Sequence, residues 1–193
     1  IGPTVNGYAR SAEITLGTYT VVETKFPQNY RKYDKDTWTV TLNSGSAKFT
    51  INAVNEIVPG ACRIIKASED GVIAGVSFRI TGNGTDETAK TNENGELIFL
   101  SLKPGRYTVT EDTEDKYIPQ ESKAVTVVTG ETAVVTFSNV LKKGSLKVIK
   151  TAEDGFKENF TFRLTGTSYS GLPVNEYAVT NNDGEAFFEN VLI

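Results

Sequence analysis

Apolar and polar residues alternate along most of this chain in short runs that are rich in valine, threonine, isoleucine, tyrosine and phenylalanine. Clusters of glycine, asparagine and aspartate separate the runs, and no long segment carries an apolar stripe with the 3.6-residue period of a helix. Alternation with a period of two is typical of strands that bury one face. The pattern therefore predicts an all-β protein.

Two kinds of internal match show how the chain is organised. GACRIIKASEDG at 60–71 matches GSLKVIKTAEDG at 144–155, and VSFRITG at 76–82 matches FTFRLTG at 160–166 with the same separation. A self-similarity at fixed spacing indicates structural repeats. A second family of matches, GTYTVVE and GRYTVTE, begins at Gly17 and at Gly105.

Only the middle of the chain contains every piece of this repeat. We therefore predict a complete repeat at 58–143, the second half of a repeat at 1–57 and the first half of a repeat at 144–193. A unit with about seven short strands has the size of a small β-sandwich, in which two sheets share one core. Asp-Gly and Asn-Gly turns separate the strands as such a fold requires. The same clusters could bind calcium, but none has the EF-hand spacing, so we predict turns and no metal site.

Composition removes several classes of function. The formal net charge of −4 on 193 residues gives no basic surface for nucleic acid or anionic lipid. The chain has no histidine, the commonest acid–base catalyst and metal ligand. Its single Cys62 forbids an internal disulfide, and its place in the repeat, equivalent to that of Leu146, predicts a core residue. We therefore expect no cofactor and no enzyme that acts on an external substrate.

Three strands of the middle unit end their inward-facing series with a polar residue. Lys66 continues the face of the first strand, Glu111 that of the strand YTVTE, and Asn139 that of the last strand. Burial of any one of them alone is unfavourable, so we expect the three side chains to meet. Two simple interpretations are a buried Lys–Glu ion pair with an asparagine hydrogen bond, and three strand ends that lie in solvent.

The combination also permits covalent chemistry. A desolvated lysine loses its proton and becomes a nucleophile, while a buried carboxyl group that stays protonated can polarise a carboxamide. The amine of Lys66 could then attack the side-chain carbonyl carbon of Asn139 and release ammonia, with Glu111 shuttling protons. The fold would hold the reacting atoms together, so proximity would supply most of the acceleration.

The motifs around these residues resemble those of the CnaB-type, prealbumin-like repeats of Gram-positive surface adhesins and pilins. The resemblance rests on K-x-x-x-D-G at 66–71, PG-x-Y-T-V-x-E at 104–111 and V-T-F-S-N at 135–139. It implies tandem Ig-like or prealbumin-like β-sandwiches, each stitched by an autocatalytic lysine–asparagine or lysine–aspartate isopeptide bond that a buried acid assists. The lysine, glutamate and asparagine named above fall on those three positions.

The resemblance implies a structural function. We expect stalk or spacer repeats of an adhesin or pilus-like protein, located outside the cell and attached to its wall, with neighbouring repeats as partners. The alternative is a carbohydrate- or host-protein-binding module of the same fold. Trp38 and Tyr33, in an aromatic stretch, are the best candidates for a ligand-binding face, although packing in the core is the favoured interpretation of these aromatic residues.

The two half repeats contain complementary parts of the site. The segment 1–57 has Glu23 and Asn55 at the positions of the acid and the asparagine but no equivalent lysine, whereas 144–193 has only Lys150. One explanation is that the chain is a piece of a longer array. Another is that the halves complete each other between chains head to tail, with Lys150 joined to Asn55 under Glu23.

Overall fold

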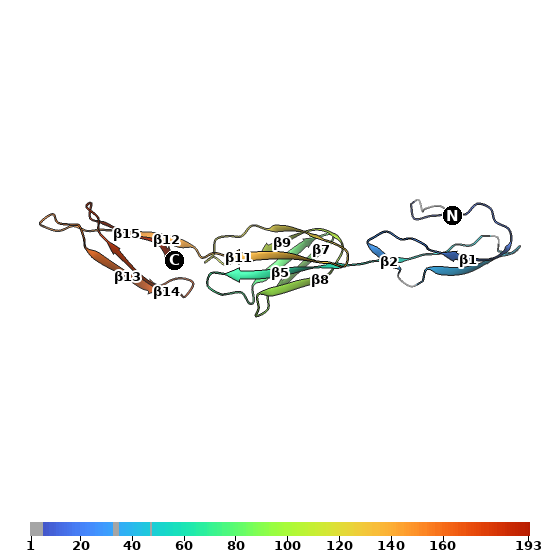
Figure 1. The fold of residues 1–193 in the computed structure, drawn as a ribbon, viewed down its shortest axis with the longest axis horizontal. Coiled ribbons are helices and arrows are strands. Elements are labelled where there is room, and N and C mark those ends of the chain that lie inside the picture. Colours follow the sequence, from blue (N-terminus) through green and yellow to red (C-terminus); the bar gives the residue numbers. More distant parts are fainter. Residues whose placement is uncertain (1–5, 33–34, 47) are drawn as a thin grey trace. The chain divides into compact units, whose positions relative to one another are not determined.

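The computed structural model describes residues 6–32, 35–46 and 48–193. The described residues form strands and no helix (Figure 1), which confirms the all-β class that the alternating pattern predicted. Two compact units divide the chain, one at Ile1–Val58 and the other at Pro59–Ile193. The first boundary lies next to the predicted start of the complete repeat, whereas the predicted boundary at residue 143 lies within the second unit.

The first unit contains two pairs of short antiparallel strands. β1 pairs with β3, and β2 pairs with β4. Val40 is the one buried apolar residue among the described residues of this unit, so its core is small. The strands are β1 (Gly17–Val22), β2 (Tyr30–Lys32), β3 (Thr37–Leu42) and β4 (Asn55–Ile57).

The first part of the second unit is a sandwich of two sheets. One sheet has the order β10-β9-β6-β7 and the other the order β11-β5-β8, with β11 parallel to β5. The first and last strands of this repeat therefore lie side by side and run in the same direction. The strands are β5 (Gly60–Ser68), β6 (Ser77–Gly82), β7 (Thr85–Lys90), β8 (Glu96–Leu102), β9 (Gly105–Glu111), β10 (Lys123–Val127) and β11 (Thr132–Asn139).

Alternate residues of both sheets build one core between them. Phe78 of one sheet and Phe137 of the other form a tilted aromatic pair with ring centroids 5.0 Å apart. Cys62 is fully buried in this core, as its position in the repeat predicted, and burial raises the pKa of its thiol. The other fully buried members are Ile64, Ile80, Leu102, Tyr107, Val109 and Val127.

The strands that follow residue 142 form two further antiparallel pairs, β12 with β15 and β13 with β14. Ala178, Ala186 and Phe188 are the buried apolar residues around which these pairs pack. Several large apolar side chains of this region are exposed, among them Leu146 at 44% and Ile149 at 65%. The strands are β12 (Lys143–Ile149), β13 (Thr161–Thr167), β14 (Pro173–Val179) and β15 (Glu185–Leu192).

Candidate functional site: a buried lysine, glutamate and asparagine

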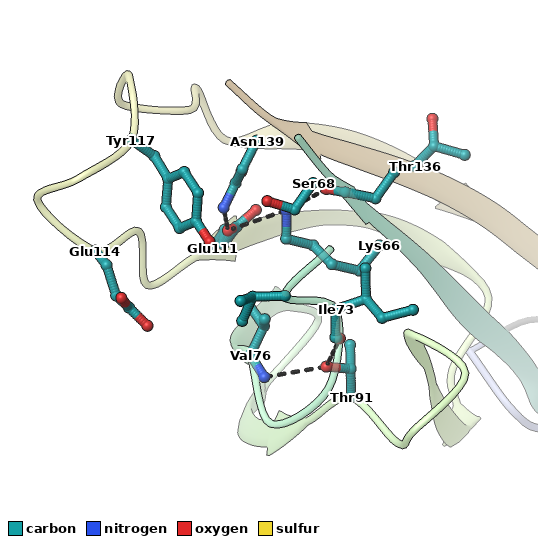
Figure 2. Close-up of polar contacts among 12 residues, drawn as sticks. Lys66, Ser68, Ile73, Val76, Thr91, Glu111, Glu114, Tyr117, Thr136 and Asn139 are labelled. Carbon is teal, nitrogen blue, oxygen red and sulfur yellow. Dashed lines mark hydrogen bonds and ion pairs between the residues drawn. The ribbon is translucent and has the colours of Figure 1, made fainter. Parts of the chain in front are cut away.

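Three strands of the sandwich bring Lys66, Glu111 and Asn139 together (Figure 2). Lys66 lies on β5 and Asn139 at the end of its parallel neighbour β11, while Glu111 reaches them from β9 in the opposite sheet. Their residues are 3%, 6% and 1% exposed, respectively. Each continues the inward-facing series of its strand, so the alternation that predicted burial holds and the solvent-exposed interpretation is wrong.

Glu111 is the centre of the contacts within this cluster. The side-chain amide of Asn139 donates a hydrogen bond to Glu111 Oε1 at 2.5 Å, and Lys66 Nζ lies 3.6 Å from the same oxygen. Lys66 Nζ also donates to the carbonyl oxygen of Ala67 at 2.6 Å. An amine, a carboxyl and a carboxamide therefore share one desolvated space.

Burial weakens the charged form of the lysine. Desolvation lowers the pKa of the Lys66 ammonium below its ordinary value of 10.5, although the nearby charges of Glu111 and Asp70 act in the opposite direction. A lowered pKa increases the fraction of neutral amine, which is the nucleophilic form. Glu111 Oε2 and Asn139 Oδ1 are buried without a hydrogen-bond partner among the described residues. Both oxygen atoms can therefore still form hydrogen bonds, and they are the atoms that a reaction at the carboxamide would use.

The turn opposite Lys66 leaves no room for a side chain. Gly95 has a φ of +73°, and a Cβ built on it would lie 2.7 Å from the carbonyl oxygen of Lys66. The amide of Lys66 donates to the carbonyl of Gly95 at 2.8 Å. The Asn-Gly turn before β8 therefore fixes the backbone of the lysine as well as reversing the chain.

A second polar cluster covers the site, and no pattern in the sequence predicted it. Tyr117 is 3% exposed, and its ring centroid lies 6.0 Å from Lys66 Nζ. Its hydroxyl donates to the carboxylate of Asp70, with distances of 3.0 and 2.9 Å to the two oxygens, and Lys116 Nζ lies 3.1 Å from Asp70 Oδ2. Asp70 belongs to the K-x-x-x-D-G motif, which we interpreted as a turn. Tyr117 lies between β9 and β10, where no alternation predicts burial.

The negative charge of Asp70 holds this second cluster together, because Tyr117 and Lys116 both contact its carboxylate. Burial raises the pKa of the Asp70 carboxyl, but hydrogen bonds from Ser68, the Val72 amide, Tyr117 and Lys116 outweigh burial and hold the pKa well below its ordinary value. Burial also lowers the pKa of Lys116, and its contacts with Asp70 and Tyr117 more than reverse that effect. Asp70 therefore stays ionised and links the end of β5 to the segment above Glu111.

The N-terminal unit repeats part of the main site. The side-chain amide of Asn55 donates to Glu23 Oε1 at 2.8 Å, which is the contact that Asn139 makes with Glu111. Both residues are half-buried, and Glu23 Oε2 and Asn55 Oδ1 have no hydrogen-bond partner among the described residues. The predicted acid and asparagine of this half repeat thus lie together without a lysine.

The C-terminal part repeats the lysine. Lys150 Nζ donates to the carbonyl of Thr151 at 2.5 Å and lies 4.6 Å from the ring centroid of Phe160. The amide of Lys150 donates to the carbonyl of Gly184, whose φ is +78°. This backbone arrangement is the one found at Lys66 and Gly95, so the lysine half of the site forms a second time.

The structure says less about Trp38 and Tyr33, the two aromatic residues that were predicted as a ligand-binding face. Trp38 is half-buried on β3, on the same face as the buried Val40, and lies opposite Val21 of β1. Tyr33 lies outside the described residues. A ligand-binding role for both residues therefore stays a prediction.

No group of three or more potential metal-binding side chains occurs in residues 6–32, 35–46 and 48–193. Within the same ranges, no helix has the length and hydropathy that crossing a membrane requires.

The chain belongs to the SpaA family of prealbumin-like fold domains. The family matches it twice, at residues 3–57 and at residues 60–141. These ranges cover most of the chain and confirm the resemblance to prealbumin-like repeats that the motifs indicated. No curated protein sequence matches the chain.

Solved structures with a similar fold include the TIE protein of Bacillus anthracis, with 19% identity and a TM-score of 0.55 over 89% of this chain and 43% of that protein. A streptococcal ancillary pilin has 16% identity and a TM-score of 0.38, over 93% of this chain and 64% of the pilin. The major pilin SpaD from Corynebacterium diphtheriae has 18% identity and a TM-score of 0.38, over 57% and 37%. The chain spans less than two thirds of the length of each of these three proteins.

Proposed function

We propose that the complete repeat is a covalently locked structural module, in which an isopeptide bond joins Lys66 to Asn139. The observation that carries the proposal is the meeting of an amine, a carboxyl and a carboxamide, from three strands, inside a sandwich core. A buried ion pair with one hydrogen bond would add little stability on its own. A bond formed once at this place would stabilise the fold permanently.

The reaction needs only the three side chains. Lys66 first gives one proton to Glu111, and the neutral Nζ then attacks the Cγ atom of Asn139. The protonated carboxyl donates a hydrogen bond to Oδ1, where negative charge develops. A second proton passes from Nζ through Glu111 to Nδ2, and the bond between Cγ and Nδ2 breaks. Ammonia leaves and carries the first proton away as ammonium, so Glu111 returns to its starting state.

An opening beside the site suits the departure of this product. A cavity of about 270 Å³ is lined by both Glu111 and Asn139 and also by Tyr117 and Ser77. Its volume exceeds that of a single water molecule, so a molecule of the size of ammonia fits within it. The acid and the carboxamide therefore have an exit on one side and the closed sandwich core on the other.

The position of the bond suits a protein that bears tension. Force applied to the repeat enters at the start of β5 and leaves at the end of β11, and these strands are parallel neighbours. A bond between Lys66 and Asn139 would transmit the force directly between them. Residues 67–138, which contain most of the sandwich, would then bear no load.

The same bond would stabilise a small domain without a disulfide. Closing the chain from residue 66 to residue 139 removes conformational entropy from the unfolded state. The estimate for a disulfide that closes a loop of this length is about 4 to 5 kcal/mol. A sandwich of this size buries only a modest share of its surface, so that contribution is large relative to its total stability.

We infer that the chain serves as stalk or spacer repeats in a surface protein of a Gram-positive bacterium, such as a pilin or an adhesin. Its family membership and the load path through β5 and β11 support this role. The parent protein would lie outside the cell and be attached to the wall, with neighbouring repeats as its immediate partners. The crosslink is autocatalytic and made once, so the repeat is not an enzyme with turnover.

The intact mass of the denatured protein tests the chemistry. We expect a mass lower by one ammonia than the sequence predicts, and the full mass in Lys66→Met and Glu111→Gln. Lys103→Ala is the matched control, since this lysine lies in an exposed turn and its substitution should leave the deficit in place. A wild-type protein with the full computed mass would show that the three residues form a polar cluster and no bond.

Single-molecule pulling tests the mechanical role. In the wild type, the segment between the two bonded residues should not extend when the repeat is stretched from its ends. In Lys66→Met this segment should contribute about 240 to 260 Å of additional contour length. Equal extension in both proteins would contradict the load-bearing function even if the bond were present.

A further inference from the structure

Two lysines of the complete repeat lie at the site, and each is paired with a different acid. Lys66 Nζ lies 3.6 Å from Glu111 Oε1, and both side chains are fully buried. Lys116 Nζ lies 3.1 Å from Asp70 Oδ2, and these side chains are 12% and 2% exposed. The proposed crosslink uses only the first pair. The second pair is an almost equally buried group of charges for which the crosslink itself has no use.

A tyrosine connects the two pairs. The centroid of the Tyr117 ring lies 6.0 Å from Lys66 Nζ and 4.9 Å from Lys116 Nζ, and its hydroxyl donates to Asp70. The charge of Asp70 acts on Lys66 and favours its ammonium form. The ionisable groups that face Lys66 are thus Glu111 of β9, Asp70 after β5 and Tyr117 before β10. Without a counter-ion of its own, Asp70 would compete with Glu111 for the amine.

We expect Asp70 to keep its charge when Lys116 is removed. The hydroxyl of Ser68 donates to Asp70 Oδ1 at 2.6 Å, and the amide of Val72 donates to the same oxygen at 3.1 Å. The Tyr117 hydroxyl is a third donor. Hydrogen bonds of this kind favour the ionised carboxylate. The loss of Lys116 would therefore leave a buried negative charge that the ammonium form of a neighbouring lysine would compensate.

The backbone around Lys116 is held without the help of its side chain. The amide of Lys142 donates to the carbonyl of Lys116 at 2.9 Å, and the amide of Ile118 donates to the carbonyl of Val140 at 2.9 Å. Tyr117 is buried between these two bonds. The charge of Lys116 can therefore be removed while the segment that covers the site stays attached.

The second pair is not itself suited to a crosslink. Against the effect of burial, hydrogen bonds hold the pKa of the Asp70 carboxyl below its ordinary value, and contacts with Asp70 and Tyr117 raise that of Lys116. Both groups are therefore charged, whereas bond formation needs a neutral amine. Burial has the opposite result at Lys66, where it lowers the pKa of the ammonium. One lysine is thus suited to react and the other to remain a cation.

We propose that Lys116 is a positioning residue that neutralises Asp70 and so leaves the amine of Lys66 free to react. This inference rests on the reaction proposed above, in which Lys66 gives a proton to Glu111 and Nζ bonds to Cγ of Asn139. The bond from Cγ to Nδ2 breaks and ammonia leaves. Lys116 forms no bond and transfers no proton in these steps.

The rate of ammonia loss tests the inference. The whole chain is made in a short pulse of cell-free synthesis, and samples are stopped at intervals in acidic urea for intact-mass measurement. At pH 7 Lys116→Met should lose ammonia about tenfold more slowly than the wild type, as a rise of about one unit in the pKa of Lys66 requires. Lys116→Arg keeps the charge and should restore most of the rate. Lys103→Met removes a charge from an exposed turn and should have no effect.

A second substitution separates charge from structure. Adding Asp70→Asn to Lys116→Met removes the charge that needs a counter-ion, so the double variant should recover the wild-type rate. The pH at half-maximal rate should rise in Lys116→Met and return in the double variant. A double variant as slow as the single one would mean that Lys116 only holds the segment in place, and would overturn the inference. A wild-type rate in Lys116→Met would also overturn it and leave the Lys66–Asn139 bond standing.

A titration that needs no bond keeps this inference separate from the crosslink. In Asn139→Ala the amine of Lys66 stays free, and NMR can follow its protonation. Its pKa should be about one unit higher when Lys116→Met is added. Equal pKa values in the two proteins would overturn the inference, even if the wild type lost ammonia. A wild type that keeps its full mass would instead overturn the crosslink, whatever the titration shows for Lys116.

Discussion

The chain contains the same acid–asparagine pair in two different surroundings. In the complete repeat the Glu111–Asn139 pair lies inside a sandwich with Lys66, whereas the Glu23–Asn55 pair of the N-terminal unit is half-buried and has no lysine. The hydrogen bond between acid and amide is present in both. The second half of a repeat is therefore sufficient to form the acid–asparagine pair. The first half adds the lysine and the strands that bury the pair.

This difference shows that the contact between the acid and the carboxamide is not enough for the proposed reaction. Contact between a carboxyl and a carboxamide is ordinary, and in partial contact with water it leads to no reaction. Desolvation is what lowers the pKa of the Lys66 ammonium and makes the amine a nucleophile.

The largest expected effect comes from removing the acid of the complete site. Glu111→Gln keeps the size of the side chain and its contact with Asn139 but cannot take a proton from Lys66. The bond should not form, and the free energy of unfolding of this repeat should fall by about 4 to 5 kcal/mol, measured by urea denaturation. Glu23→Gln is the matched control in the half-buried pair and should leave this transition unchanged. Equal effects of the two substitutions would remove the distinction between the two surroundings.

The next effect concerns the cluster that covers the complete site and has no described counterpart over Glu23. Asp70→Asn removes a buried carboxylate that Tyr117 and Lys116 contact, so stability at neutral pH should fall by about 2 to 3 kcal/mol. The folded pKa of Asp70 lies below its ordinary 3.8, so its contribution is complete above that pH and is lost as the pH falls through the lower folded value.

Melting temperatures measured from pH 7 down to pH 2 check this prediction. The difference between wild type and Asp70→Asn should be constant above pH 5 and should shrink below about pH 4. Asp86→Asn, in an exposed ion pair with Arg79, is the control and should change the melting temperature little. A pH-independent difference would mean that packing, and not charge, links Asp70 to Tyr117.

A smaller effect should appear when the lysine stays but its target is removed. In Asn139→Ala the Lys66 amine remains free and buried, and its pKa stays below the ordinary 10.5. Between the lowered pKa and 10.5 the unfolded state binds more protons than the folded state. Stability should therefore rise with pH in that window, by up to about 1.4 kcal/mol per pH unit. Denaturation from pH 7 to pH 10.5 measures this slope, which should vanish in the Lys66→Met, Asn139→Ala double variant.

Much of this site could be predicted from the sequence because strands impose a strict period. Lys66, Glu111 and Asn139 each continue a two-residue alternation, so their burial follows from the residues before them. Their meeting in one place does not follow from alternation. It depends on β11 lying parallel to β5 and on β9 lying in the opposite sheet, an arrangement that the alternation does not contain. The meeting was expected because burial of any one of the three residues alone is unfavourable, and the motif resemblance implied the same three positions.

The cover over the site could not be predicted in this way. Tyr117 lies in an irregular segment, where no periodicity relates a residue to the core. Asp70 is in an Asp-Gly turn, and turn chemistry alone is a sufficient reason for an aspartate there. Their contact joins residues far apart in the sequence, which depends on the tertiary structure and not on local pattern.

The smallest expected effect concerns Trp38, in the N-terminal unit that lacks a complete core. Trp38→Ala should destabilise the β1–β3 pair by about 1 kcal/mol, since the ring is only half-buried beside Val40. Because Trp38 is the one tryptophan of the chain, hydrogen exchange of the β1 and β3 amides is a better measure than fluorescence. These amides should exchange several-fold faster, and those of β5 and β11 should not change. Thr39→Ala, on the exposed face, is the control. Unchanged exchange together with loss of binding on a glycan array would instead favour a ligand-binding face, and would give the half repeat a function that the complete repeat does not have.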